Sequence, residues 1–150
     1  MTIKEARIED LEEVAKLFDA YRVFYKQSSD MEAAKAFINE RIELEESVIF
    51  VAEAQNGAIA YNAGFTQLYP FFTSVGMSRK WVLNDLFVHP DFRRMGVARK
   101  LMETAIDFAR STGASGLALE TAIDNGAAQP LYEALGFVKD TEYYHYDLKL

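Results

Sequence analysis

The 150-residue sequence predicts an α/β (or α+β) fold in which a mixed sheet carries helices on both faces. Two kinds of segment support this class. In some, apolar side chains recur at helical spacing, and in others they alternate with polar ones. The segments follow one another in the order β-α-α-β-β-β-α-β-α-β-β. No repeat, linker or low-complexity stretch interrupts them, so we expect one domain over residues 1–150.

The N-terminal part should form one strand and two helices. Thr2–Ile8 alternates between polar and apolar residues, which is typical of a strand. Asp10 and Glu13 then form a capping-box pattern that opens a helix to about Tyr25. A second pair of this kind, Ser29 with its Glu three residues later, opens a helix that extends to about residue 44.

Three strands should follow, and the first two form a hairpin. Ser47–Ala54 and Ala58–Leu68 are rich in β-formers, and the Asn-Gly pair between them is the strongest short hairpin signal. Pro70–Gly76 is expected to be a loop. Trp81–Val88 is the next strand, which a proline stops two residues later.

The C-terminal half begins with a helix over about Met95–Arg110, whose apolar residues form a single stripe. Gly113 is placed to follow its last turn. The remaining expected elements are a strand at Leu117–Thr121, a short helix at Gln129–Leu135 and an alternating tail, Val138–Leu150, that closes the sheet.

Composition excludes several classes of function. There is no cysteine, so disulfides, thiolate metal sites, iron–sulfur clusters and a cysteine nucleophile are excluded. The two histidines, His89 and His145, argue against a multi-histidine zinc site, and no metal is expected. A net charge of −7 argues against nucleic acid as a partner. No apolar run is long enough to span a bilayer and no signal peptide is evident, so we expect a cytoplasmic protein without membrane contact.

The positive charge is distributed unevenly. Arg93, Arg94, Arg99 and Lys100 place four of the 16 basic residues within eight positions. Such an island on an acidic chain suggests a small anionic ligand. It also fits a solvated basic helix end, and charge alone leaves both interpretations open.

The surroundings of this island favour a pyrophosphate site. A strand ends, a tight turn follows, and a helix begins within ten residues. Gly96 and Ala98 lie at the helix start, where small residues let a ligand approach the backbone. The first helical N–H groups have no acceptor within the helix, and the helix dipole adds partial positive charge. The segment is neither a Walker A loop nor a Rossmann fingerprint.

Three motifs together resemble the GNAT family of N-acetyltransferases. The pattern Arg93-x-x-Gly96-x-Ala98 is similar to the family's acetyl-CoA pyrophosphate motif. It follows the strand that ends at Val88 and precedes Leu131–Phe137, which is similar to the family's C-terminal motif. The resemblance implies a mostly antiparallel sheet of about seven strands flanked by four helices. That sheet would splay between strands 4 and 5, where acetyl-CoA binds.

The resemblance also implies roles for individual residues. Phe87 and Val88 would pair with the pantetheine arm, and the Val88 N–H would bond the thioester carbonyl and then its oxyanion. Such a donor typically supplies about 3 kcal/mol of transition-state stabilisation. Asn125 would lie close to the same arm. The pyrophosphate would be held by Arg93, Arg94, Met95, Gly96, Val97, Ala98 and Arg99.

Tyr132 matches the family's usual general acid. A CoA thiolate leaves when an amine attacks the thioester. The thiol pKa of about 8.5 lies below the tyrosine pKa of about 10, so partial proton donation is sufficient. Taken alone, Tyr132 also fits a core aromatic residue on an amphipathic helix; within the motif, the resemblance implies the acid.

The base that deprotonates the acceptor amine is less well defined. Some relatives carry a glutamate on the fourth strand, whereas this chain has Asn84 and Asp85 there. Asn84 cannot be a base, so Asp85 and Glu120 are the candidates, either directly or through water. Asp85 could instead bind a substrate cation, face solvent, or pair with an arginine. We read His89 as a surface residue.

The family's acceptor pocket lies between the first two helices and the loop before the fourth strand. Aromatic residues there would wall an apolar or cationic substrate, or would be buried in a dimer interface. Tyr25, Tyr69, Asp85 and Glu120 are the substrate candidates. The aromatic set is Tyr21, Phe24, Tyr25, Tyr69, Phe71, Phe72 and Trp81.

Together these features predict an acetyl-CoA-dependent N-acetyltransferase that acts directly on a primary amine of a small molecule, with a possible homodimer. No covalent acetyl-enzyme is expected, because the chain has no cysteine and no evident Ser-His pair. Three alternatives stay open. They are a protein or peptide N-acetyltransferase, a non-catalytic acetyl-CoA sensor or interaction module, and an unrelated α/β nucleotide-binding protein with a similar phosphate cradle.

Overall fold

The computed structural model describes residues 1–150. The chain packs as two compact units, Met1–Glu120 and Thr121–Leu150. The first unit holds the whole sheet and the helices α1, α2 and α3, and the second holds α4. No helix is long and apolar enough to cross a membrane. One N-acetyltransferase domain over the full chain stays a prediction.

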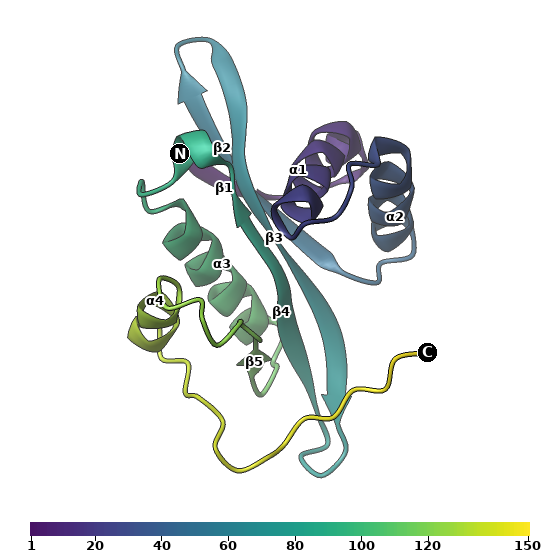
Figure 1. Ribbon diagram of the computed structural model, residues 1–150, viewed down its shortest axis with the longest axis vertical. Coiled ribbons are helices and arrows are strands. Elements are labelled where there is room, and N and C mark those ends of the chain that lie inside the picture. Colours follow the sequence, from purple (N-terminus) through teal and green to yellow (C-terminus); the bar gives the residue numbers. More distant parts are fainter. The chain divides into compact units, whose positions relative to one another are not determined.

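The sheet has five strands in sequential order, and its first three junctions are antiparallel while the last is parallel. Figure 1 shows β2, β3 and β4 as long, curling strands that dominate the sheet. The strands are β1 (Thr2–Glu5), β2 (Val48–Asn56), β3 (Ile59–Thr73), β4 (Ser78–Val88) and β5 (Leu117–Ala118).

Helices cover both faces of this sheet, as predicted (Figure 1). The helices α1 (Leu11–Phe24) and α2 (Met31–Glu43) lie on one face, and α3 (Val97–Ser111) lies on the other. On the α1 face, aliphatic and aromatic side chains of α1, α2, β2, β3 and β4 form one core cluster. On the α3 face, the Phe108 ring packs edge-on against Phe50 and Trp81. The helices α1 and α3 therefore bury their apolar sides against the sheet, and α2 packs against α1.

A β-bulge interrupts the ladder between β3 and β4. Gln67 pairs with Asp85, and Leu68 pairs with Leu83, so Asn84 is the extra residue on β4. A bulge of this kind re-aims the side chains on either side of it. Here the Thr66 hydroxyl also donates to the Asp85 carbonyl at 2.8 Å and so stabilises the bulge. Asp85 consequently points its side chain toward the α1 face, beside Gln67.

The junction between β4 and β5 is short. Only Trp81 and Val82 pair with β5, through Leu117 and Ala118. Beyond Val82 the two strands no longer pair, which leaves the β5-side edge of β4 open from Leu83 to Val88. This confirms the predicted splay between strands 4 and 5.

The second unit contains α4 (Gln129–Ala134), which agrees with the predicted short helix at Gln129–Leu135 and carries a proline in its first turn. Gly136 follows the helix with a φ of +96°, which suits glycine at that position. The predicted tail strand is wrong, because Val138–Leu150 forms no strand and the sheet has five strands rather than about seven. Alternation is not sufficient for a strand, which also needs a hydrogen-bonded neighbour, and this unit contains no other strand.

Two local predictions also need correction. Pro70–Gly76 is not a loop throughout, because β3 continues to Thr73 and its residues pair with those of β4. There, the Arg79 guanidinium lies 5.2 Å from the centre of the Phe72 ring. The first strand ends at Glu5 rather than residue 8, and a 3-10 turn follows it.

The helix caps also differ from the predicted residues. The Asp10 carboxylate accepts from the backbone N–H of Arg7 and does not cap α1. Asp30 rather than Ser29 caps α2, by accepting from the Ala33 N–H at 3.0 Å. The Ser29 hydroxyl instead donates to the buried Asp19 carboxylate.

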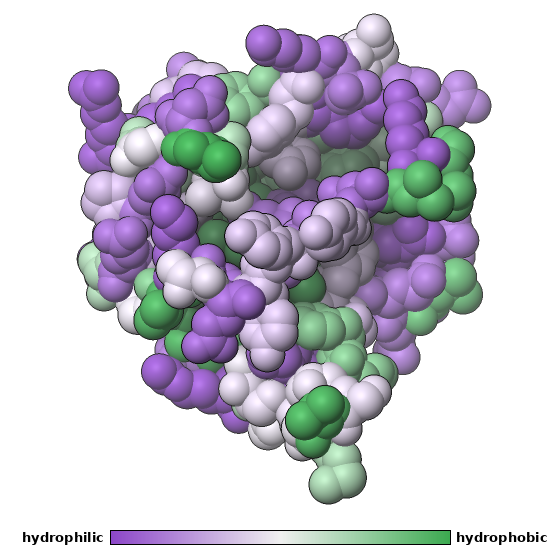
Figure 2. Space-filling view, turned by 60° about the horizontal axis from the view of Figure 1, so that its bottom comes forward, coloured by the Kyte–Doolittle hydropathy of each residue, from purple (hydrophilic) through white to green (hydrophobic).

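On the face drawn in Figure 2, hydrophobic side chains lie in small patches between hydrophilic ones. Phe72, Val75 and Met77, near the turn between β3 and β4, are exposed large apolar residues. Scattered residues of this kind are normal on a protein surface. They carry no argument for a homodimer, which stays a prediction.

Candidate active site

The C-terminal end of β4 presents a backbone donor on the open edge of the sheet. The His89 N–H donates to the Ala63 carbonyl of β3 at 2.8 Å. Backbone groups of successive strand residues point to opposite edges, so the N–H and C=O of Val88 point away from β3. The Val88 carbonyl accordingly accepts from Arg93 Nε at 3.2 Å. The Val88 N–H therefore faces the edge that β5 leaves open.

Gly64 lies opposite Val88 and makes a close backbone approach possible. A Cβ atom at Gly64 would lie 2.5 Å from the Phe87 carbonyl oxygen and 3.2 Å from the Val88 Cα. Both neighbours are backbone atoms and cannot rotate away. Glycine at position 64 is thus required for the position of the Val88 donor.

The turn after β4 leads into an anion cradle at the start of α3. Arg94 and Gly96 have positive φ angles of 62° and 77°, and Gly96 is the N-cap residue. No side chain caps the helix, and the first helical hydrogen bond runs from the Lys100 N–H to the Gly96 carbonyl. The N–H groups of residues 97–99 therefore have no acceptor within the helix. No atom lies within 4 Å of a Cβ position at Gly96, so the cradle is open on that side.

The guanidinium groups around the cradle differ in what they contact. Arg93 bonds the Val88 carbonyl and stacks on the Phe24 ring, 5.2 Å from its centre, so it ties the end of β4 to α1. Arg99 pairs with Glu103 one turn along α3 at 3.1 Å. Arg94 and Met95 are exposed beside the cradle. The segment from residue 93 to 99 thus combines backbone N–H groups that have no acceptor within the helix with nearby positive charge, which fits a pyrophosphate group.

Asp85 is the buried carboxylate of this region, with 4% of its surface exposed. It accepts from Gln67 Nε2 at 2.5 Å, from Asn84 Nδ2 at 3.1 Å and from the Tyr21 hydroxyl. Burial raises the pKa of Asp85, and these three donors oppose the rise. Asp85 forms no ion pair. It neither faces solvent nor pairs with an arginine, so these two interpretations of Asp85 are wrong.

Aromatic residues of α1 and β3 surround Asp85. The Tyr21 ring packs edge-on against Tyr25 and Phe65, at 5.0 Å and 5.8 Å between centres. Burial raises the pKa of Tyr21, and raises that of Tyr69 to about 12, with the charge of Asp85 adding to both shifts. Tyr25 is 56% exposed and so lies at the rim. The structure thus places Tyr21, Tyr25 and Tyr69 in one cluster with Asp85.

Other members of the predicted aromatic set lie elsewhere. The Trp81 indole donates to the Thr112 hydroxyl on the α3 side, and Phe72 is exposed near the turn after β3. Glu120 is exposed at the end of the first unit. The His89 ring caps the short turn after β4 by accepting from the Asp91 N–H, in agreement with a surface role.

The second unit carries Asn125 and Tyr132. Asn125 precedes α4, and its side-chain amide donates to the Thr121 hydroxyl at 3.2 Å. Tyr132 lies on α4, half-buried, with its ring 6.4 Å from that of Phe137. The Phe137 N–H donates to the Tyr132 carbonyl, so the two motif residues are held by the end of the helix.

Sequence reasoning missed Gln67 and Ser47. Gln67 is fully buried on β3, and its side chain bonds both Asp85 and the Ser47 hydroxyl. The signal was present in the sequence, because an amide in the middle of an apolar strand needs a partner. The identity of that partner depends on the pairing of β3 with β4.

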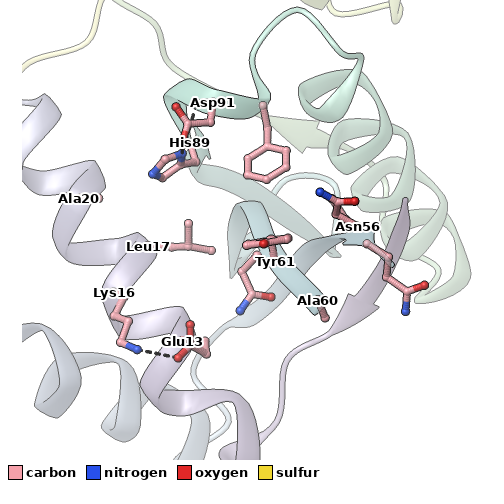
Figure 3. Close-up of a pocket in the computed structure, with 13 residues that line it drawn as sticks. Glu13, Lys16, Leu17, Ala20, Asn56, Ala60, Tyr61, His89 and Asp91 are labelled. Carbon is pink, nitrogen blue, oxygen red and sulfur yellow. Dashed lines mark hydrogen bonds and ion pairs between the residues drawn. The ribbon is translucent and has the colours of Figure 1, made fainter. Parts of the chain in front are cut away.

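A separate hollow of about 720 Å³ lies between α1, the turn from β2 to β3 and the short helix after β4 (Figure 3). Leu17 and Tyr61 point into it, and the Lys16–Glu13 ion pair lies at its rim. None of the predicted site residues lines this hollow.

Comparison with known proteins identifies relatives over the whole chain. The profile of the Acetyltransferase (GNAT) family matches residues 11–137. The uncharacterized N-acetyltransferase YhfO of Bacillus subtilis is 45% identical over 150 residues, which cover 100% of this chain and 98% of YhfO. A probable acetyltransferase of Haemophilus influenzae is 31% identical over 81% of this chain and 82% of its own. The crystal structure of a probable acetyltransferase, 39% identical, has a TM-score of 0.94 and covers 100% of this chain and 98% of its own.

Proposed function

The chain belongs to the GNAT family and is an acetyl-CoA-dependent N-acetyltransferase, and we propose that it acetylates a primary amine of a small molecule by direct transfer in the cytoplasm. The observation that carries the proposal is the continuous segment from β4 to α3. It offers the Val88 N–H on an open strand edge, and a few residues later an open cradle of helix N–H groups.

Acetyl-CoA supplies the acetyl thioester. Val88 donates its backbone N–H to the carbonyl oxygen, where negative charge develops during attack. The backbone from Arg94 to Arg99 holds the pyrophosphate, and Phe87 and Asn125 align the pantetheine arm. Tyr132 donates a proton to the departing sulfur. The motif match supports each of these assignments, and the local geometry adds support for the Val88 donor and the cradle of residues 94–99.

The acceptor amine must lose a proton before it attacks. An alkylammonium ion with a pKa of about 10.4 costs roughly 4.6 kcal/mol to deprotonate at pH 7. Asp85 is suited to this step because burial raises its pKa toward the working pH, which makes it a better base than an exposed aspartate. A buried carboxylate without a cationic partner also attracts the ammonium form.

The surroundings of Asp85 support a slender acceptor. The carboxylate is 4% exposed, and Tyr21, Tyr69 and Phe87 enclose it or lie beside it, with Tyr25 at the rim. A primary amine on an alkyl chain can approach such a group, and aromatic rings favour a cationic head. A peptide acceptor would have to present a lysine side chain or its N-terminal amine. We therefore propose a small-molecule acceptor, with a peptide acceptor as the alternative.

Release of CoA, followed with a thiol-reactive dye, tests the proposal. The chain has no cysteine, so the protein itself contributes no background. We expect acetyl-CoA with a small primary amine from a panel of polyamines, amino acids and aminoglycosides to release thiol, and mass spectrometry to find one added acetyl group. Release with basic peptides alone would favour a peptide acetyltransferase. Binding of acetyl-CoA without release on any amine would favour a sensor.

A further inference from the structure

We propose that Gln67 is a positioning residue for Asp85, and that Ser47 sets the direction in which the Gln67 amide points. The link from Gln67 to the acceptor amine rests on the proposed function, because there Asp85 serves that amine. The link from Gln67 to Asp85 rests on the structure alone.

The geometry is a row of three hydrogen-bonded side chains, one from the residue before β2 and one each from the neighbouring strands β3 and β4. The Ser47 hydroxyl, just before β2, donates to Gln67 Oε1 at 2.7 Å. Gln67 Nε2 on β3 donates to Asp85 Oδ2 on β4 at 2.5 Å. Gln67 is fully buried and Asp85 is nearly so. Exposed water therefore cannot replace these partners, and each side chain depends on the next.

Ser47 allows the hydrogen bonds that link Ser47, Gln67 and Asp85 to run in either of two directions. An ionised carboxylate only accepts, so it needs the amide N–H₂ of Gln67, while the serine hydroxyl donates to the amide oxygen. A protonated Asp85 can instead donate its O–H. Gln67 then satisfies it by turning its amide oxygen toward Asp85, and its N–H₂ donates to the serine oxygen. Neither protonation state leaves a buried polar atom unpaired, so Asp85 can take up and release a proton without a change in packing.

The other groups around Asp85 do not compete for this proton. Tyr21 on α1 and Tyr69 on β3 lie close enough to Asp85 for its charge to act on them, and Tyr25, just after α1, packs against Tyr21. Burial raises the pKa of Tyr21 and Tyr69, so both stay neutral at pH 7. Arg41 of α2 acts on Tyr69, but it is paired with Glu40 and with Glu46, each at 3.2 Å. Asp85 is therefore the buried carboxyl group of this cluster, and its pKa is raised above the ordinary value by burial.

The test is a ¹³C NMR titration of the Asp85 carboxyl carbon in the unliganded full chain, with the signal assigned by its loss in Asp85→Asn. Gln67→Met removes the amide but keeps length and apolar packing. Losing a donor to the carboxylate should raise the Asp85 midpoint by about one pH unit. Ser47→Ala keeps Gln67 but removes the hydrogen bond that holds its amide, so it should raise the Asp85 midpoint by a smaller amount. Gln55→Met, an exposed position on β2, is the matched control and should leave the midpoint unchanged.

Kinetics provide the second readout. In Gln67→Met the acid limb of the kcat/KM profile should move to higher pH by the same amount as the NMR midpoint, with the KM for acetyl-CoA unchanged. An Asp85 midpoint equal to that of the wild type in both Gln67→Met and Ser47→Ala would overturn the inference. Asp85→Asn with wild-type turnover and pH profile would instead overturn the role of Asp85 in the proposed function.

Discussion

Replacing Gly64 by alanine tests whether the end of β4 is held where the Val88 donor is needed. The added Cβ would lie 2.5 Å from the Phe87 carbonyl oxygen, and this distance must lengthen to about 3.4 Å for ordinary contact. The atoms that have to move belong to the backbone of the donor strand. That strand is also fastened on both sides of the clash, by the Thr66–Asp85 and His89–Ala63 hydrogen bonds.

The size of the effect follows from this geometry. Overpacking of a well-packed interior costs typically about 1–3 kcal/mol, and the entropy that alanine removes from the unfolded chain offsets only about 0.4–1 kcal/mol of it. A displacement of about 1 Å at a catalytic group can lower the rate by about 100-fold. We therefore expect Gly64→Ala to unfold at a lower denaturant concentration and to lose about 10- to 100-fold in kcat/KM.

Urea unfolding and the thiol-release assay measure the two effects, and Gly116→Ala is the control. Its Cβ would also be too close to a neighbour, at 2.9 Å, but that neighbour is the flexible Cε of Lys80. This variant should stay within about 0.5 kcal/mol of the wild type and keep its turnover. Gly64→Ala with wild-type stability and turnover would refute the reasoning that links Gly64 to the Val88 donor.

Three further predictions concern the titratable groups. Because burial raises the folded-state pKa of Asp85, the folded protein keeps a proton that the unfolded chain loses above about pH 4, and stability falls as pH rises through the folded pKa. The amide in Asp85→Asn does not titrate, so the Tm of this variant minus that of the wild type should increase as pH rises through that window. A constant Tm difference would contradict this. Tyr132→Phe should lower kcat by about 10- to 1,000-fold with little change in acetyl-CoA binding, and unchanged turnover would remove Tyr132 as the acid. Arg94→Ala should raise the KM for acetyl-CoA by about three- to tenfold at constant kcat, since its exposed charge aids binding only, and an unchanged KM would exclude that contact.

The order of helices and strands could be predicted from the sequence because local spacing determines it. The apolar stripe of α3, the Asn-Gly turn and the proline at the start of α4 each act over a few residues. The tail failed for the complementary reason. The alternation of polar and apolar residues over Val138–Leu150 is local, but a strand forms only if a partner strand lies alongside it.

The candidate site likewise has one part that could be predicted from the sequence and one part that could not. The cradle at Gly96 and the strand end at Val88 lie within one short segment, so their motif could be recognised directly. The environment of Asp85 could not be, because it depends on the bulge at Asn84 and on pairing with Gln67, eighteen residues away. Whether a strand carboxylate faces solvent, pairs with an arginine or is buried is a tertiary property, and the sequence left the first two open beside a role as base or substrate site.

The most direct test of the central claim follows the amide resonance of Val88 in ¹H–¹⁵N spectra during titration with acetyl-CoA and, separately, with CoA. If the Val88 N–H on the open edge of β4 donates to the thioester carbonyl, its proton should shift downfield with acetyl-CoA and much less with CoA. The N–H groups of residues 97–99 should shift with both. Shifts at residues 97–99 without any at Val88 would contradict the account, because the cofactor would then bind the cradle without placing its acetyl group at this strand.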